Sequence, residues 1–248
     1  YSGDVTITNN DYTLAQLVTI NSSTSGSITL SSPGVALSGS SGDFVSAFAG
    51  TVTEHTGTIA ITNSDYTLDQ LVTINNASTG AITLSTTDTP ISGSSTLYSA
   101  ALAGTINYSG NVSITNNDYT AAELSNINTG TTGSLSLTHT GVALSGTSSQ
   151  IAAGFAGDVT EHTGTIAISN ADYTLTELIA INNGSTGAIT FTTTNTALEG
   201  TSTQLAQALA NSSNYAGQVT ITNADYTADQ LKTINNGTGG AIVLQQTG

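Results

Sequence analysis

The tripeptide Asp-Tyr-Thr occurs five times, and the intervals between its copies alternate between 54 and 53 residues. Its copies begin at Asp11, Asp65, Asp118, Asp172 and Asp225. A fixed period of this length is typical of repeat architectures, in which each repeat packs mainly against its neighbours. The chain is therefore expected to fold as stacked copies of one small unit.

A second period, twice as long, overlies the first. The segment Thr-Glu-His-Thr-Gly at 53–57 returns at 160–164, and Tyr1, Tyr108 and Tyr215 begin matching segments. This pattern indicates that a pair of 53/54-residue units was duplicated as a block. We interpret the chain as block 1–107, block 108–214 and a partial third block, 215–248, joined in one continuous solenoid.

Each unit contains two short stretches in which apolar and hydroxyl residues alternate, as in a half-buried strand. Their matched positions are Ile7, Leu30, Ile61, Leu84, Ile114, Leu137, Ile168, Phe191, Ile221 and Leu244. Shorter steps, such as Ile7 to Leu30, alternate with longer ones, such as Leu30 to Ile61. Even the shorter step suits a helical crossover and is too long for a hairpin, so the sequence predicts about ten parallel strands.

A helix is marked in every shorter step. A threonine precedes a Gln or Glu by three residues, which is a capping box, in the pairs Thr13/Gln16, Thr67/Gln70, Thr120/Glu123, Thr174/Glu177 and Thr227/Gln230. A tyrosine before the cap and a leucine five residues after that tyrosine complete a hydrophobic staple in all five copies. The helix is expected to end near Asn21 and its equivalents, before Gly26.

The longer step carries a second, shorter helix. Apolar residues at spacing i, i+3, i+4 give one stripe, for example Phe44, Ala47 and Phe48. Ser40, Thr147 and Thr201 are its expected caps, and the remaining residues, around Leu37 and Glu54, are assigned to loops. The predicted fold is an α/β repeat solenoid with a single parallel sheet of about ten short strands and short helices on the opposite side.

The outward side of that sheet is predicted to be a ladder of hydroxyl groups. Its residues are Thr6, Thr8, Thr29, Ser31, Thr83, Ser85, Ser113, Thr115, Thr190 and Thr192. Regular hydroxyl and methyl arrays are used by some ice-binding solenoids, whereas β-propensity and solvation explain threonine on an open strand face without any ligand. Ala60, Ala167 and Val243 interrupt the ladder.

Charge argues against one class of partner, and the length of the apolar runs argues against membrane insertion. Sixteen acidic residues face one basic residue, Lys232, for a net charge of −15, which repels phosphate backbones, so nucleic-acid binding is not expected. No apolar run approaches the roughly 20 residues of a membrane span, so no membrane insertion is expected. The chain has no cysteine, which removes disulfides and thiolate chemistry.

The phrase Asp-Tyr-Thr-Leu-x-Gln-Leu-x-x-Ile-Asn, followed by Thr-Gly-x-Ile-Thr-Leu, resembles the repeats of giant bacterial cell-surface and secreted proteins, adhesin-like or S-layer-like, of the marine cyanobacterial type. The likeness extends over the whole chain. It implies an extracellular or cell-surface location, a role as structural material, and no catalytic residues to carry over.

Few residues suggest chemistry. The Asp11, Asp65, Asp118, Asp172 and Asp225 column is a calcium candidate, but we favour the interpretation that each Asp closes a turn before the capping box by bonding its own backbone. Glu54-His55 and Glu161-His162 are adjacent pairs whose side chains should point to opposite sides, so they are interpreted as solvated loops and not as metal sites. We predict no catalytic, metal or cofactor site beyond that possible calcium, and no enzymatic activity.

The leading functional hypothesis is a structural protein that forms a filament, coat or adhesin stalk. The repeat strand begins at once, at Val5, and Ile242-Val243-Leu244 lies close to the other end, so we expect head-to-tail self-association or a longer tandem array. The alternative is a binding module for glycan, calcium or ice that uses the Thr/Ser-rich sheet face. A carbohydrate-active enzyme is a third possibility, weakened by the absence of Arg.

Overall fold

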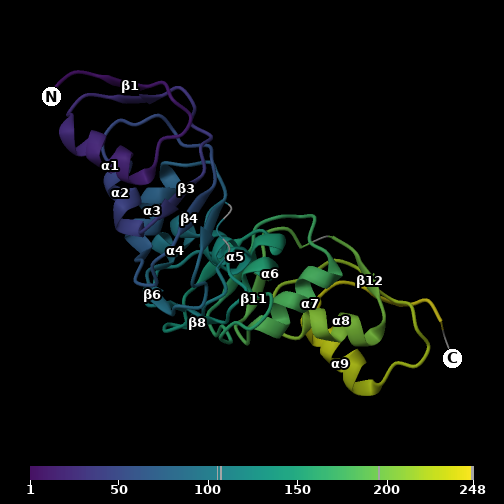
Figure 1. Ribbon diagram of the computed structural model, residues 1–248. Helices are drawn as coiled ribbons and strands as arrows, with labels where there is room; N and C mark the ends of the chain where they lie inside the picture. Colours follow the sequence, from purple (N-terminus) through teal and green to yellow (C-terminus); the bar gives the residue numbers. More distant parts are fainter. Residues whose placement is uncertain (105, 107, 195, 247–248) are drawn as a thin grey trace. The chain divides into compact units, whose positions relative to one another are not determined.

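The computed structural model describes residues 1–104, 106, 108–194 and 196–246, which form two compact units. The first comprises Tyr1–Val112 with Gly130–Ser134, and the second comprises Ser113–Thr129 with Leu135–Gly248. Figure 1 follows the chain through its helices and strands. Strands and helices alternate in both units, which confirms the predicted α/β repeat layout.

The helices are of two kinds, as predicted. The longer ones are α1 (Leu14–Ser23), α3 (Leu68–Asn76), α5 (Ala121–Gly130), α7 (Leu175–Gly184) and α9 (Ala228–Gly237). The shorter ones are α2 (Ser41–Ala47), α4 (Ser95–Ala101), α6 (Ser148–Gly154) and α8 (Ser202–Leu209). Within the first unit α1, α2, α3 and α4 pack in succession, and within the second α6, α7, α8 and α9 do so.

The strands have three residues each. They are β1 (Val5–Ile7), β2 (Ile28–Leu30), β3 (Leu37–Gly39), β4 (Ile59–Ile61), β5 (Ile82–Leu84), β6 (Ile91–Gly93), β7 (Val112–Ile114), β8 (Leu135–Leu137), β9 (Leu144–Gly146), β10 (Ile166–Ile168), β11 (Ile189–Phe191), β12 (Leu198–Gly200), β13 (Val219–Ile221) and β14 (Ile242–Leu244). The ten predicted strands are all present, and the described residues add β3, β6, β9 and β12, which were assigned to loops.

These strands form several small parallel sheets, so the prediction of one ten-stranded sheet is wrong. The first unit holds the sheets β1-β2 and β3-β4-β5, and the second holds β9-β10-β11 and β12-β13-β14. The division between the units falls within β7, between Val112 and Ser113. The error arose because each missed strand is only Leu/Ile-Ser/Glu-Gly, directly before a helix cap, and pairs only with the strand beyond that helix.

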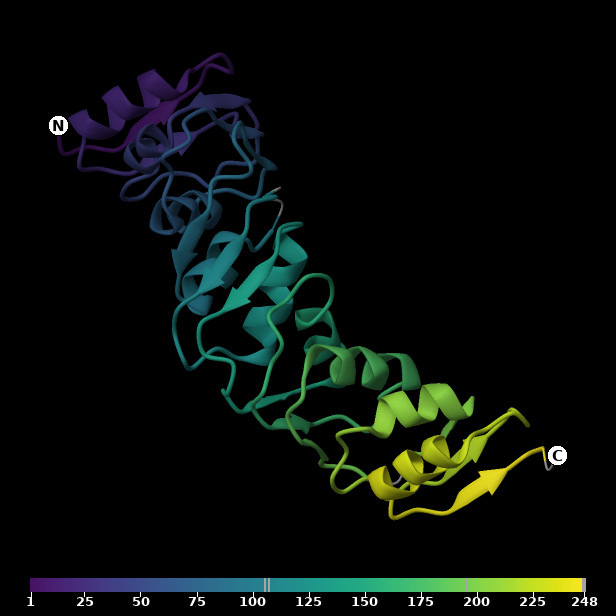
Figure 2. The same cartoon turned by 90° about the horizontal axis from the view of Figure 1, so that it is seen from below.

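The four added strands show which elements make up one repeat. Each complete sheet is a β-α-β-α-β element, such as β3-α2-β4-α3-β5, in which both connections between parallel neighbours are helical crossovers. In that sheet Leu37 lies opposite Ile59, and Ile59 opposite Ile82. Figure 2 shows the last such element in green to yellow, with α8 and α9 beside the strands.

The capping boxes form as predicted. In α7, the Thr174 hydroxyl accepts from the Glu177 amide at 3.2 Å, and Glu177 Oε2 accepts from the Thr174 amide at 2.8 Å. The reciprocal pair also forms at Thr120 and Glu123 and in the three remaining copies. Ser40, Thr147 and Thr201 cap shorter helices, joined by Ser94.

The staple tyrosines have a second role. Four of them are buried, and their hydroxyls donate to a carbonyl 20 residues later: Tyr12 to Ser32, Tyr66 to Thr86, Tyr119 to His139 and Tyr173 to Thr193. Burial raises the pKa of Tyr119 to about 12. Each tyrosine therefore joins the start of a helix to the loop that follows the next strand.

Glycine columns permit the close approach of successive strands. Gly164 and Gly187 precede the paired strands β10 and β11, and a Cβ on Gly187 would overlap the Gly164 carbonyl oxygen. In the same way, a Cβ added to the later glycine would overlap the carbonyl oxygen of the earlier one in the pairs Gly3/Gly26, Gly57/Gly80, Gly110/Gly133 and Gly217/Gly240. No side chain fits at these positions without separating the paired backbones.

We expect Gly187→Ala to lower the free energy of unfolding by about 3 kcal/mol, because the new methyl group overpacks against backbone that cannot rotate away. Gly141→Ala is the matched control, since its Cβ would lie 3.9 Å from the nearest atom, Thr163 Oγ1. Urea denaturation of both variants measures the difference. Equal unfolding free energies would contradict the close-packing argument.

Candidate functional site

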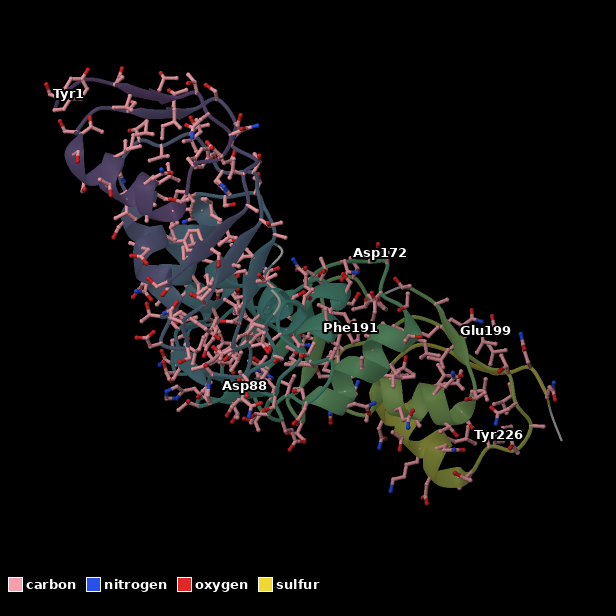
Figure 3. All side chains as sticks on the ribbon, viewed as in Figure 1. Tyr1, Asp88, Asp172, Phe191, Glu199 and Tyr226 are labelled. Carbon is pink, nitrogen blue, oxygen red and sulfur yellow. The ribbon has the colours of Figure 1, made fainter. Side chains whose placement is uncertain are left out.

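Each aspartate of the Asp-Tyr-Thr column lies in an exposed loop after a strand. Figure 3 labels Asp172, at the outer end of such a loop. The partner is the same in all five copies: the asparagine two residues earlier donates its side-chain amide to the Asp Oδ1, at 2.5 Å for Asn9/Asp11, 2.7 Å for Asn63/Asp65, 2.6 Å for Asn116/Asp118, 2.7 Å for Asn170/Asp172 and 2.6 Å for Asn223/Asp225.

At Asp65, Asp172 and Asp225 the bond stabilises the ionised carboxylate. The side-chain amide of the preceding asparagine, and then the residue's own backbone amide, lower the pKa of Asp65, Asp172 and Asp225 below the ordinary value. Both donors favour the interpretation of each Asp as a turn residue. Among the described residues, no three His, Cys, Asp or Glu side chains gather as metal ligands would. The calcium assignment for this column stays a prediction.

Three of these asparagines, Asn63, Asn170 and Asn223, also bind the start of a shorter helix, a role that sequence reasoning missed. Asn170 Oδ1 accepts from the backbone amide of Ser148 at 2.8 Å, and its Nδ2 donates to Ser148 Oγ at 3.0 Å. Asn63 bonds to Ser41 and Asn223 to Ser202 in the same way. The second amide hydrogen goes to the aspartate, so both amide hydrogens of these side chains are used.

The serine that begins each of these short helices also bonds to the capping box of the following long helix; we call this Ser, Asn and Glu/Gln cluster the polar joint. Ser148 is fully buried, and its hydroxyl donates to Glu177 Oε2 at 2.9 Å. Ser41 donates to Gln70, and Ser202 to Gln230, at the same distance. A serine beside a carboxylate can suggest a nucleophile, but this hydroxyl has no exposed surface and is already bonded on both sides. The arrangement therefore holds the start of each shorter helix against the capping box of the next longer one.

The Glu-His pairs point to opposite sides, as predicted, but only the glutamates are solvated. Glu54 and Glu161 are exposed, whereas His55 and His162 are 0 % exposed. The solvated-loop interpretation is thus wrong for both histidines. The reason is visible in the repeat: His55 and His162 occupy the position of Tyr108 and Tyr215, which are also buried.

The histidine and tyrosine side chains at this position bond to backbone carbonyls at equivalent places in their repeats. His162 Nε2 lies 2.8 Å from the Val142 carbonyl oxygen, and His55 Nε2 lies 2.8 Å from that of Val35. The tyrosine hydroxyls donate to the corresponding carbonyls, Tyr108 to Thr89 and Tyr215 to Thr196. Since a carbonyl only accepts, the histidine Nε2 carries the proton.

Protonation of these rings is unfavourable. Desolvation by burial lowers the pKa of both His55 and His162 below the ordinary 6.5, although the backbone bonds at Val35 and Val142 act in the opposite sense. Nδ1 of His55 is buried without a hydrogen-bond partner, and Nδ1 of His162 faces only the Ser185 hydroxyl, at 3.3 Å. A second ring proton would therefore find no charged acceptor. His139 differs, being exposed.

The hydroxyl face is present, but divided among the small sheets. The ten predicted outward Thr and Ser residues are all exposed or partly exposed. Several donate to the backbone of the preceding strand, as Ser85 does to the Ile61 carbonyl at 2.9 Å and Thr192 to that of Ile168 at 3.1 Å. An open pocket of about 540 Å³ on this face is lined by Ala171, Thr192, Thr193, Thr194 and Thr196.

A more apolar pocket lies on β1, α1 and the loop between them, which we call the first coil. Its volume is about 380 Å³, and its lining is Ile7, Asn9, Tyr12, Ala15, Gln16, Thr19 and Ile20. Ile20 is partly exposed, whereas its equivalents Ile74, Ile181 and Ile234 are 0 % exposed. The residues that join neighbouring helices elsewhere are thus accessible here.

Comparison with known proteins identifies no relative: no protein-family model, no curated protein and no solved structure matches the chain. In the part of the chain that the structure describes, no helix combines the length and apolar character needed to cross a bilayer.

The buried histidines predict a specific pH dependence. Because the folded pKa lies below the unfolded value, the unfolded chain takes up protons first as the pH falls. The free energy of unfolding should be at its full value above about pH 6.5 and decrease from pH 6.5 to pH 5. The double variant His55→Gln/His162→Gln should show a flatter profile, measured by urea denaturation at pH 7 and pH 5.

His139→Gln is the control, because that ring is exposed, and it should keep the wild-type profile. A wild-type stability that does not change between pH 7 and pH 5 would refute the assignment. So would equal profiles for wild type and double variant.

Proposed function

We propose that the chain is extracellular structural material, a stretch of filament, surface coat or adhesin stalk built by end-to-end continuation of one solenoid. The observation that carries the proposal is the first coil, where Asn9, Gln16 and Ile20 form an open pocket although their equivalents bind a neighbouring coil. A repeat that presents its own internal contacts at a surface has the chemistry of an assembly interface.

The last coil supports the proposal from the other side. The amide of Asn182, on the longer helix α7, donates at 2.7 Å to the Ala208 carbonyl in the last turn of the following short helix α8. Asn21 does the same for α2, at the carbonyls of Ser46 and Ala47. The equivalent residue on α9 is Asn235, which is exposed.

Charge favours joining along the stack rather than sideways. Sixteen acidic residues face a single basic residue, Lys232, so few lateral salt bridges can form, and like charges repel between flanks. The proposed end contacts are instead backbone pairing, amide-hydroxyl bonds and apolar burial. The proposal assigns no enzymatic activity, and its extracellular setting rests on the resemblance of the Asp-Tyr-Thr repeats to surface-protein repeats.

The second candidate is a binding module for glycan, calcium or ice on the Thr/Ser-rich face. The pocket of threonines around Thr193 favours it. Against it, Thr192 and Thr193 donate their hydroxyl protons to backbone carbonyls, so these two groups offer a ligand mainly acceptor oxygens. A ligand on this face would have to supply the donors.

The assembly proposal predicts reversible or filamentous self-association. In sedimentation velocity and negative-stain microscopy, the chain should form species larger than the 24.8 kDa monomer as its concentration rises. Ile20→Glu places a charge in the pocket of the first coil and should reduce association. Ala36→Glu adds the same charge at an exposed loop and should leave it unchanged. A monodisperse 24.8 kDa particle at all concentrations would refute the proposal.

The calcium alternative has a direct test. If the Asp column binds Ca²⁺ selectively, millimolar calcium should raise the melting temperature by mass action, and Asp172→Asn should reduce the rise. We expect instead a small rise that magnesium reproduces, because both ions screen the net charge of −15. Differential scanning calorimetry with each ion at equal ionic strength separates the two outcomes.

A further inference from the structure

The occupant of the pocket on the first coil can be inferred from equivalent surfaces elsewhere in the chain. On β13 and α9, the equivalent surface is covered by one continuous segment, β12 and α8. Its strand pairs Leu198 with Val219 and Gly200 with Ile221. Its helix begins at Ser202, whose amide donates to Asn223 at 2.7 Å and whose hydroxyl donates to Gln230 at 2.9 Å.

Two other copies repeat this arrangement. β3 and α2 cover β4 and α3 through Ser41, Asn63 and Gln70. β9 and α6 cover β10 and α7 through Ser148, Asn170 and Glu177. In all three, a three-residue strand that ends in glycine leads through a Ser or Thr cap into a short helix whose first residue is a buried serine.

The first coil carries the same receptor, at the corresponding place in the first block. Val5, Ile7, Asn9, Gln16 and Ile20 correspond to Val219, Ile221, Asn223, Gln230 and Ile234. Asn9 and Asp11 already form the amide-carboxylate bond found in the occupied copies. Gln16 Oε1 already accepts from the Thr13 amide. The receptor is therefore pre-organised before anything binds it.

The strand edge matches as well. In the occupied copy, the amide of Thr222 donates to the Gly200 carbonyl at 3.0 Å. The residue equivalent to Thr222 is Thr8, which follows β1 on the edge away from β2. A strand docked at β1 would take this amide as its partner.

We propose that this surface binds one strand-and-short-helix segment of the Leu198–Leu209 type, supplied by a further repeat of the same kind. The inference rests on the proposed function and names the partner of its assembly interface. It also affects how two copies would join. In each unit a long helix packs against a short one, but a direct end-to-end contact would bring together α1 and α9, which are both long helices. Two end coils therefore need such a segment between them.

The test supplies the segment at its natural spacing. A second copy of residues 196–214 is placed directly before Tyr1, so that Tyr1 takes the place of Tyr215 in the repeat. Tethering gives the segment a high effective concentration, so docking does not depend on the weak affinity of a free peptide. The matched control carries Ser→Ala and Leu→Ser in the added copy, at the positions of Ser202 and Leu205, leaving composition and charge nearly unchanged.

Two readouts are measured on monomeric protein. Hydrogen exchange of the Thr8 amide should slow at least about tenfold in the extended chain, and the melting temperature should rise by about 3 °C. Asn9→Ala in the extended chain should remove most of both effects, whereas Asn10→Ala, at an exposed neighbour, should remove neither. The control extension should resemble the unextended protein.

Unchanged Thr8 exchange in the extended chain would overturn the inference, as would equal effects of the designed and control extensions. Its outcome is separate from that of the assembly test. Docking of the added segment without self-association of the unextended chain would support the receptor and refute direct assembly. Self-association that persists while the added segment fails to dock would show that copies join through their own end coils instead.

Discussion

Close pairing of the backbones on either side of each long helix is the constraint on which the rest of the structure depends. His162 pairs with Ser185 and Ile166 with Ile189, and Gly164 and Gly187 lie between these pairs. A side chain at Gly187 would separate the strands and remove both sets of ladder bonds. Because parallel neighbours need a crossover connection, which is usually helical, the same spacing leaves room for a helix in each gap. The longer helix thus follows from the glycine column and the parallel pairing together.

Strand pairing alone does not determine how each short helix sits against the next long helix. The polar joints between them determine that position. Ser148 of α6, Asn170 of the loop after β10 and Glu177 of α7 bond directly to one another. Buried polar groups are costly when unpaired, so a displaced helix would leave several unsatisfied donors. This penalty gives each short helix one position relative to the next long one. It also explains why the first coil, which holds the same groups, is the strongest candidate for an interface.

The longer repeat period, which spans two units, has a packing explanation. At one buried position His55 and His162 alternate with Tyr108 and Tyr215. The neighbouring apolar residue alternates as well: the rings of Phe48 and Phe155 lie 5.6 and 5.4 Å from the histidine rings, whereas Leu102 and Leu209 precede the tyrosines. A large neighbour accompanies the smaller ring and a smaller neighbour the larger ring, which conserves core volume. Both rings can reach the same type of carbonyl, so the polar requirement is met in either case.

The sequence by itself determined the repeat, the long and short helices, their caps and ten strands, because these depend on contacts within a few residues and on a strict period. Only the tertiary structure decided the four Leu/Ile-Ser/Glu-Gly strands and the division into small sheets, since three residues become a strand only when a distant backbone pairs with them. The burial of His55 was equally hidden: alternation placed it opposite Glu54 but not inside the core. The joint between Ser41, Asn63 and Gln70 joins residues up to 29 apart, and no local pattern specifies which of many hydroxyl and amide groups will meet.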